Sequence, residues 1–218
     1  MKFEHKYFKE IDNGNNNAII ELAKLYDNNG RYRNAESFYL LYINKYLKSL
    51  INEINKETEY MKYILLIRKY EQEYISTLYC LVINYMRQNK YLLVEQYSEL
   101  IVNKYLNCKY YKDDELYSEI LLTIGKFYIN YKRFELAEQY LLLGASNNYL
   151  SSILSLIEIY TYQKKYYYVI NYYLILFVKY PDVENIKHHY RKLSNIYTII
   201  KDYDSAEHYY KLSFLRTN

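Results

Sequence analysis

The sequence is poor in the residues that interrupt helices. Its 218 residues include one proline, four glycines and no tryptophan. Sheets and irregular loops use glycine and proline freely at their turns, so this scarcity favours long helices joined by short connections. A chain of this length is also long enough to bury a large apolar surface. We therefore predict an all-α protein, organised as a single domain over residues 1–218.

Cysteine and net charge are also low. The two cysteines, Cys80 and Cys108, stand alone in helical surroundings, which favours reduced thiols over a disulfide. A net charge of +4 is too small to indicate a nucleic-acid or membrane partner by itself.

Charges interrupt any apolar core near the N-terminus, and the most apolar stretch, Tyr172–Val178, is far too short to span a bilayer. We expect no signal peptide, no membrane association and a cytoplasmic location.

The sequence predicts no catalytic, metal or cofactor site. His188 and His189 are adjacent, so their side chains diverge on a helix, and no Cys-x-x-Cys or His-x-x-x-His spacing is present. Isolated glycines make no phosphate-binding loop. We interpret the acidic run Asp113–Glu115 as the start of a helix. Because no nucleophile and base stand at a recognisable spacing, we predict that the protein is not an enzyme.

Tyrosine, in contrast, is very abundant, with 35 residues. It is only a moderate helix former, so the helices must be held mainly by packing. AT-rich coding also favours Tyr, Asn, Lys and Ile, and this bias is an alternative origin for part of the excess. Five tyrosines, here called the anchor tyrosines, belong to a repeated pattern: Tyr26, Tyr85, Tyr128, Tyr160 and Tyr197.

Three columns follow each anchor tyrosine. An aromatic residue stands six positions later, a small or β-branched residue nine positions later, and a second aromatic twelve positions later. The middle column, here called the seam residues, consists of Ala35, Val94, Ala137, Val169 and Ala206. Upstream of each anchor, apolar, aromatic or small residues recur with the period of an amphipathic helix. Each repeat is therefore predicted to be an antiparallel pair of helices that cross at the seam residue.

Two further features of the repeat have a structural interpretation. A small residue in the first helix, such as Gly125 or Ser194, would let a neighbouring helix approach closely. Cations also stand just before the aromatic that opens the second helix: Arg31, Lys90, Arg133 and Lys165. They lie near the C-terminal end of the first helix, where a positive charge offsets the helix dipole. We interpret them as structural residues rather than as ligand-binding residues.

The complete pattern resembles the tetratricopeptide repeat (TPR). The stretch Leu193–Tyr210 carries the stripe of apolar and small residues, the tyrosine that ends the first helix, the aromatic after the turn, the alanine and the last aromatic. The stretch Tyr140–Tyr160 is similar to the related Sel1-type repeat. The richness in tyrosine and asparagine resembles versions of these repeats in large DNA viruses. The resemblance implies an α-solenoid of about five antiparallel helix pairs.

The spacing between anchor tyrosines departs from that family. Successive anchors are 59, 43, 32 and 37 residues apart, whereas the period of the family is near 34 residues. The first gap contains a charged, helix-patterned insertion over residues 51–74 without proline or glycine. We interpret it as extensions of the flanking helices with a break near residues 55–58, which predicts longer helices in the first third. In the second gap, Asp113 or Asp114 is expected to cap the next helix.

In the resembled family, the first helices of the pairs line a concave groove, and an extended peptide or a partner helix is its natural guest. Carried over by spacing, the groove surface would comprise Asn17, Lys24, Asp27, Tyr79, Ile83, Arg87, Glu119, Lys126, Asn130, Glu158, Tyr162, Arg191 and Asn195. Charges there are mixed, without the basic row that clamps a peptide's terminal carboxylate in some relatives. We predict a module for protein–protein interaction or scaffolding. The alternative interpretation is that these are solvated positions on a scaffold.

RNA binding is the alternative function. Helical-pair repeats can read RNA one base per repeat, and aromatic residues with lysine and arginine can stack on bases. Here the tyrosines fall on the apolar columns, which favours a core role, and the basic residues are scattered rather than striped. A protein is therefore the favoured partner over nucleic acid. The sequence is also compatible with a homo-oligomer.

Overall fold

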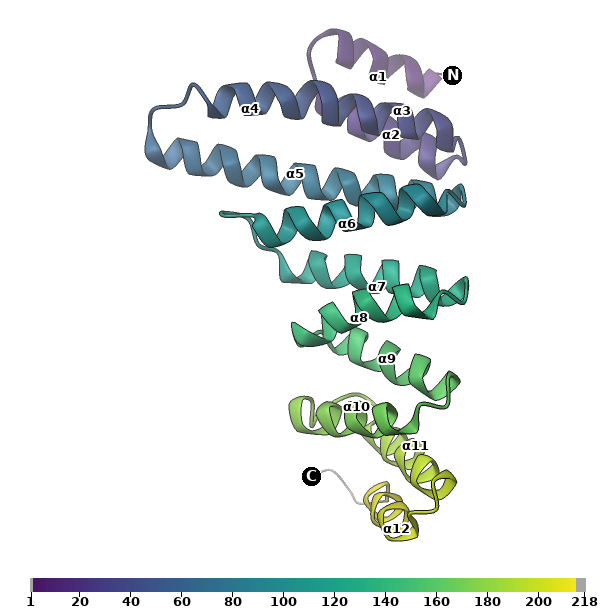
Figure 1. The fold of residues 1–218 in the computed structure, drawn as a ribbon. Coiled ribbons are helices and arrows are strands. Elements are labelled where there is room, and N and C mark those ends of the chain that lie inside the picture. The colour runs from purple at the N-terminus through teal and green to yellow at the C-terminus, as the bar shows by residue number, and fades with distance from the viewer. Residues whose placement is uncertain (1, 215–218) are drawn as a thin grey trace. The chain divides into compact units, whose positions relative to one another are not determined.

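The computed structural model describes residues 2–214, and over this range the chain is all-helical, without a β-strand. The prediction of an all-α protein is confirmed. Contacts divide the chain into two compact units, Met1–Asp114 and Glu115–Asn218. The helices of both are drawn in Figure 1. The organisation of residues 1–218 as a single domain stays a prediction. Between residues 2 and 214, every helix is too short or too polar to cross a bilayer.

The first unit is built from neighbouring helices that pack on one another. Its elements are α1 (Lys2–Asp12), α2 (Asn17–Asn28), α3 (Tyr32–Leu41), the π-helical segment η1 (Tyr42–Leu47), α4 (Lys48–Ile54), α5 (Tyr60–Arg87) and α6 (Tyr91–Asn107). The helix pairs α2–α3 and α5–α6 are the two predicted repeats, and α3 packs on α5 between them. In Figure 1, α3, η1 and α4 follow one another as a single continuous helix.

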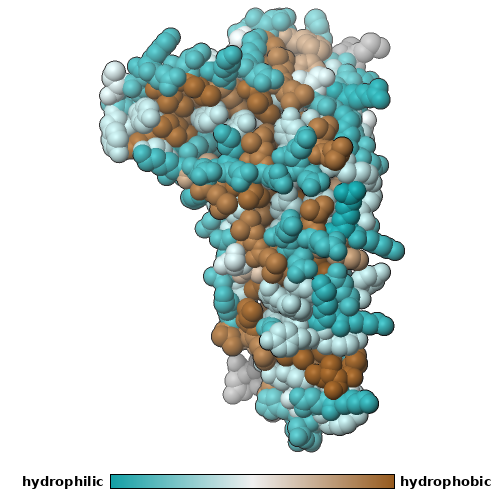
Figure 2. Space-filling view, viewed as in Figure 1, coloured by the Kyte–Doolittle hydropathy of each residue, from teal (hydrophilic) through white to brown (hydrophobic). Residues whose placement is uncertain are grey.

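The insertion in the first unit is formed by α4 and the first half of α5. The chain breaks between them at residues 55–59, and α5 is 28 residues long, so the predicted break and the predicted long helices are both confirmed. Apolar surface lies between these two helices in Figure 2. A hollow of about 510 Å³ there is lined by Leu65 and Leu66 together with charged side chains. The π-helical segment was not predicted, and its Tyr42 and Leu47 are buried in one core cluster with Ile19.

The second unit also consists of helices packed on their neighbours in sequence. Its elements are α7 (Asp114–Asn130), α8 (Phe134–Ser146), α9 (Leu150–Tyr162), α10 (Tyr166–Lys179), α11 (Ile186–Ile199) and α12 (Tyr203–Leu212). The helix α9 packs on both α8 and α10, and α11 packs on α12. Because α7 begins at Asp114, the acidic run in the second gap lies at the start of a helix, as predicted.

The repeat found in the sequence is present in the packing. Every seam residue is buried, and the aromatic six positions after each anchor is the first residue of α3, α6, α8, α10 or α12. The ring of each anchor tyrosine also packs on the aromatic twelve positions later, with centroids 5.3 to 6.0 Å apart. The core role of the seam residues and of the stacked ring pairs is therefore confirmed in both units. The aromatic six positions after the anchor is not buried, and Tyr203 in that column is 64% exposed.

A common turn joins the two helices of every pair. The residue four positions after the anchor has a positive φ at Gly30, Asn89, Lys132, Lys164 and Lys201. The next backbone N–H donates to the carbonyl oxygen of the anchor, as from Lys90 to Tyr85 at 3.0 Å. This is the hydrogen bond of the Schellman motif that ends helices. Lysine and asparagine accept the left-handed conformation at a modest cost, which explains how the sequence manages with so few glycines.

Close helix approach occurs where small residues were noted. A Cβ atom built on Gly125 would lie 2.7 Å from the Leu141 side chain, so α7 and α8 touch at this point. In the last pair, the Ser194 hydroxyl donates to the carbonyl oxygen of Ala206 at 2.7 Å. The small residues of the first helices thus permit the crossings that bury the seam residues.

Candidate partner-binding groove

The predicted groove residues of the first unit are in several different environments. They are Asn17, Lys24, Asp27, Tyr79, Ile83 and Arg87. Asn17 and Lys24 are exposed on α2, while Ile83 is half-buried on α5. Tyr79 is buried. Asp27 is only 6% exposed and forms an ion pair with Arg87 at 2.8 Å. Two of the predicted groove residues therefore form an ion pair with each other within the chain.

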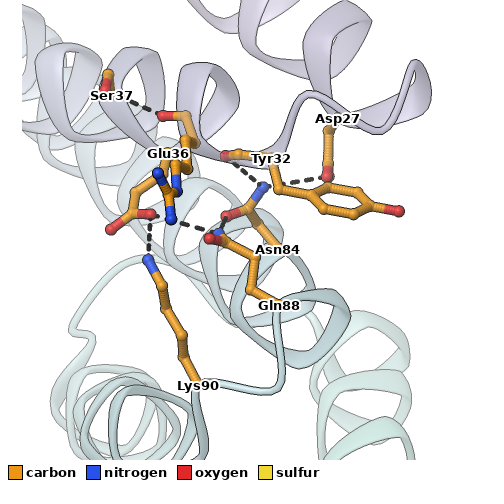
Figure 3. A network of polar contacts seen from close by, with 8 residues as sticks. Asp27, Tyr32, Glu36, Ser37, Asn84, Gln88 and Lys90 are labelled. Atoms are coloured by element: carbon orange, nitrogen blue, oxygen red, sulfur yellow. Dashed lines mark hydrogen bonds and ion pairs between the residues drawn. The ribbon is translucent and has the colours of Figure 1, made fainter.

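Asp27 also belongs to a polar network that joins α2 and α3 to α5 (Figure 3). The buried Asn84 amide donates to Asp27 and to the carbonyl oxygen of Tyr32, both at 3.1 Å. Gln88 donates to the Asn84 side-chain oxygen at 2.6 Å and to Glu36 at 3.3 Å. Since these groups are bonded within the chain, they are poor candidates for contacts with a partner.

In the second unit, some of the predicted residues come together and others do not. Asn130, Glu158, Tyr162 and Asn195 line two adjoining hollows. Glu119 and Lys126 are exposed on α7 and line neither hollow. Arg191 lies elsewhere: its guanidinium carbon is 5.1 Å from the centre of the Phe214 ring, and its Nε donates to Ser213 at 3.4 Å.

The smaller hollow has a volume of about 190 Å³ and lies between α7, the turn after it, α8 and α9. Its lining residues are Ile129, Asn130, Lys132, Phe134, Glu158, Ile159 and Tyr162. The Phe134 and Tyr162 rings pack on each other with centroids 5.2 Å apart. Aliphatic and aromatic side chains thus form its walls, with polar groups at the edge.

The larger hollow has a volume of about 740 Å³ and lies between α9, α10 and α11. Its lining residues are Leu154, Ile157, Glu158, Thr161, Tyr162, Tyr173, His189, Lys192, Asn195 and Ile196. Ile157, Tyr173 and Ile196 are buried, whereas Glu158, Lys192 and Asn195 are exposed. An apolar floor with a charged and polar rim is typical of a recognition surface.

Both hollows share Glu158 and Tyr162, which lie one turn apart on α9, so we name them together the α9 groove. The Tyr162 side chain is 64% exposed and stands where the hollows adjoin. Within residues 2–214, the side chains of Glu158, Lys132 and Lys192 form no hydrogen bond or ion pair. The α9 groove therefore combines an exposed aromatic ring with charges that have no partner in the described chain.

His189 adds a polar group to the larger hollow. Its Nδ1 atom is buried and has no hydrogen-bond partner within residues 2–214. Burial lowers the pKa of His189, and the positive charges of Lys192 and His188 lower it further. The imidazole is therefore neutral around pH 7 and adds no positive charge to the groove.

Sequence reasoning missed several lining residues: Lys132, Phe134, Tyr173, His189 and Lys192. The family spacing carried over positions of the first helices only, so the turn residue Lys132 and the second-helix residues Phe134 and Tyr173 had no counterpart in it. The helical period does supply a signal for Lys192, because it lies one turn before Asn195 on α11.

The sequence matches no protein-family model, and no curated protein matches it either. Among solved structures, the chain is similar to BtubC (BKLC) from P. vanneervenii, with a TM-score of 0.56 and 14% sequence identity. The similarity covers 92% of this chain and 78% of that one. At this identity the likeness concerns the helical fold alone.

Proposed function

We propose that the protein is a TPR-like α-solenoid that acts as a protein-interaction or scaffolding module and binds an extended peptide of its partner in the α9 groove. The repeated elements support the fold part of this proposal. The same ring pair, buried seam residue and left-handed turn recur at fixed offsets from each anchor tyrosine. Repeated helix pairs of this kind bury their apolar faces against one another and leave one face of each pair for binding.

The observation that carries the binding proposal is the pair of adjoining hollows around Tyr162. An extended peptide directs alternate side chains to one side, so neighbouring hollows can receive successive side chains of that set. Exposed tyrosine at the centre of a surface is a frequent hot-spot residue in protein interfaces. The rim offers the amide groups of Asn130 and Asn195, which can donate to and accept from a peptide backbone.

RNA binding has less support than peptide binding. Stacking on bases needs exposed aromatic faces. The anchor tyrosines Tyr85, Tyr128 and Tyr160 are buried and pack on other aromatic rings of the chain. These anchor tyrosines therefore stabilise the helix pairs and are not available as stacking platforms.

The proposal is tested by selecting random peptides on the full chain and measuring the affinity of the enriched peptides by fluorescence anisotropy. We expect Tyr162→Ala to weaken their binding about 10-fold, which corresponds to about 1.4 kcal/mol. The matched control is Tyr203→Ala, since Tyr203 is also 64% exposed but lies on α12 and lines neither hollow. Peptides that bind both variants equally, or oligo-RNA that binds where no peptide does, would contradict the proposal.

A further inference from the structure

We infer that the α9 groove selects peptides by an alternating charge order, with a basic residue opposite Glu158 and acidic residues opposite Lys132 and Lys192. Apolar side chains between these charges would enter the two hollows. This inference rests on the proposed function and adds the chemical class of the peptide to it.

The order of charges along the groove follows from which hollow each residue lines. Lys132 lines the smaller hollow, Lys192 lines the larger one, and Glu158 lines both. A guest that spans both hollows therefore meets positive, negative and positive charge in succession. The side chains of Lys132, Glu158 and Lys192 have no hydrogen-bond or ion-pair partner within residues 2–214. A peptide with the complementary order of charges would provide an ion-pair partner for each of them.

Peptides of a single charge sign are disfavoured by the same order. A wholly acidic peptide places a carboxylate against Glu158, and a wholly basic peptide places cations against Lys132 and Lys192. Exposed ion pairs each change affinity by up to about 5-fold, and like charges act in the opposite direction. A peptide with all three charges reversed is therefore expected to bind about 10- to 100-fold more weakly than the matched peptide. A peptide of a single sign, which is mismatched at one or two positions, lies between these two.

The apolar part of the guest is set by the hollows. The smaller one, about 190 Å³ and walled by Ile129, Phe134 and Ile159, has room for one bulky aliphatic or aromatic side chain. The larger one has an apolar floor that includes Ile157 and Ile196, and its volume of about 740 Å³ accommodates a larger apolar group. The preferred guest thus alternates charged and apolar residues, as an extended chain with two chemically different sides does.

His189 does not alter this order near neutral pH. It lines the larger hollow beside Lys192, but its imidazole is neutral there because burial disfavours the charged form. The positive charge at this end of the groove is therefore that of Lys192.

The test repeats the peptide selection on the full chain with charge-reversed variants. Peptides enriched on the unchanged protein should carry a central lysine or arginine flanked by apolar and then acidic residues. Selection on Glu158→Lys should change the central residue to an acidic one, and selection on Lys192→Glu should change one outer residue to a basic one. The control Glu135→Lys makes the same charge change on an exposed residue of α8 that lines neither hollow, and it should leave the pattern unchanged.

The affinities of a selected peptide and of its charge-reversed counterpart complete the test. The reversed peptide should bind about 10- to 100-fold more weakly at low salt, and the difference should shrink at 1 M salt. If the selected peptides depend on Tyr162 but show the same central charge on the unchanged protein and on Glu158→Lys, the inference is wrong and the proposed function stands. If no selected peptide depends on Tyr162, both fail.

Discussion

The two units occupy equivalent repeat positions with different chemistry. The positions compared are the residue after the first anchor tyrosine of a unit, the residue before its second anchor, and the second residue after that second anchor. In the first unit these residues are Asp27, Asn84 and Arg87. The second unit has Ile129, Ile159 and Tyr162 at the same three positions. The polar set bonds to itself at 2.8 and 3.1 Å, whereas the apolar set lines a hollow. We call the space between two successive helix pairs a joint. The joint is therefore closed by polar bonds in the first unit and contains a hollow in the second.

A second contact of the joint is the same in both units. Ten residues after an anchor, Glu36 and Glu138 each meet the lysine of the following turn, at 2.6 Å for Lys90 and 3.8 Å for Lys165. Glu138 also accepts a hydrogen bond of 2.7 Å from the Tyr160 hydroxyl. This contact agrees with a structural role for the turn cations and adds a carboxylate partner to the helix end. The units thus share one part of the joint and differ in the other.

The largest expected effect concerns what the units share. Ala137→Asp places a carboxylate at a helix crossing of the second unit, where the alanine side chain is fully buried. We expect the free energy of unfolding to fall by about 3–5 kcal/mol and the unfolding transition to lose its cooperativity. Thermal denaturation followed by circular dichroism measures both. Ala35→Asp should act similarly in the first unit, and an unchanged midpoint for either variant would contradict the repeat alignment.

A smaller effect separates the units. Arg87→Ala removes the cation that pairs with the buried Asp27, and we expect a cost of about 1–3 kcal/mol because that carboxylate stays buried. The equivalent change in the second unit, Tyr162→Ala, removes an exposed ring and should cost less than about 1 kcal/mol. Urea denaturation of both variants checks this difference. Equal costs would mean that the two joints are energetically alike.

The smallest expected effect is a pH dependence of stability caused by His189, which lines the larger hollow of the second unit. The pKa of His189 is lowered in the folded state, so the unfolded chain binds the proton first. The free energy of unfolding is therefore fully maintained above about pH 6.5 and decreases as the pH falls through the lowered pKa of the folded state. Between pH 7 and 5.5 we expect a change below about 1 kcal/mol in urea denaturation.

The control for this pH dependence is the neighbouring residue. His189→Gln should abolish the decrease, whereas His188→Gln, at an exposed position, should retain most of it. The attribution to His189 would be wrong if the decrease persisted unchanged in His189→Gln.

The sequence contained enough information for the helix pairs but only part of the groove. The seam residues and the anchor tyrosines could be predicted as buried, because a small residue at a helix crossing and a pair of stacked rings both require close packing. The position of Asp27 on a helix face was also predictable. Its bonds to Arg87 and Asn84 were not, because spacing does not reveal whether polar side chains from separate helices meet each other.

Two further differences have local causes. Arg191 shares the spacing of a groove residue, but its side chain turns toward Phe214 and Ser213 at the end of α12. The π-helical segment Tyr42–Leu47 carries no proline or glycine that would mark it. It shifts the register between α3 and α4 through packing in the core around Ile19, which depends on residues distant in the sequence.

The left-handed turn at Lys132 has a consequence for how such a protein can change. Its conformation is held by the backbone bond from Arg133 to Tyr128, at 2.9 Å, while its side chain points to the rim of the smaller hollow. Replacement of this residue, even by glycine, would preserve the hairpin and remove a positive charge from the rim of the smaller hollow. The charge on the rim of this hollow can thus be changed by a single substitution at a turn, at almost no risk to the helix pairs that support it.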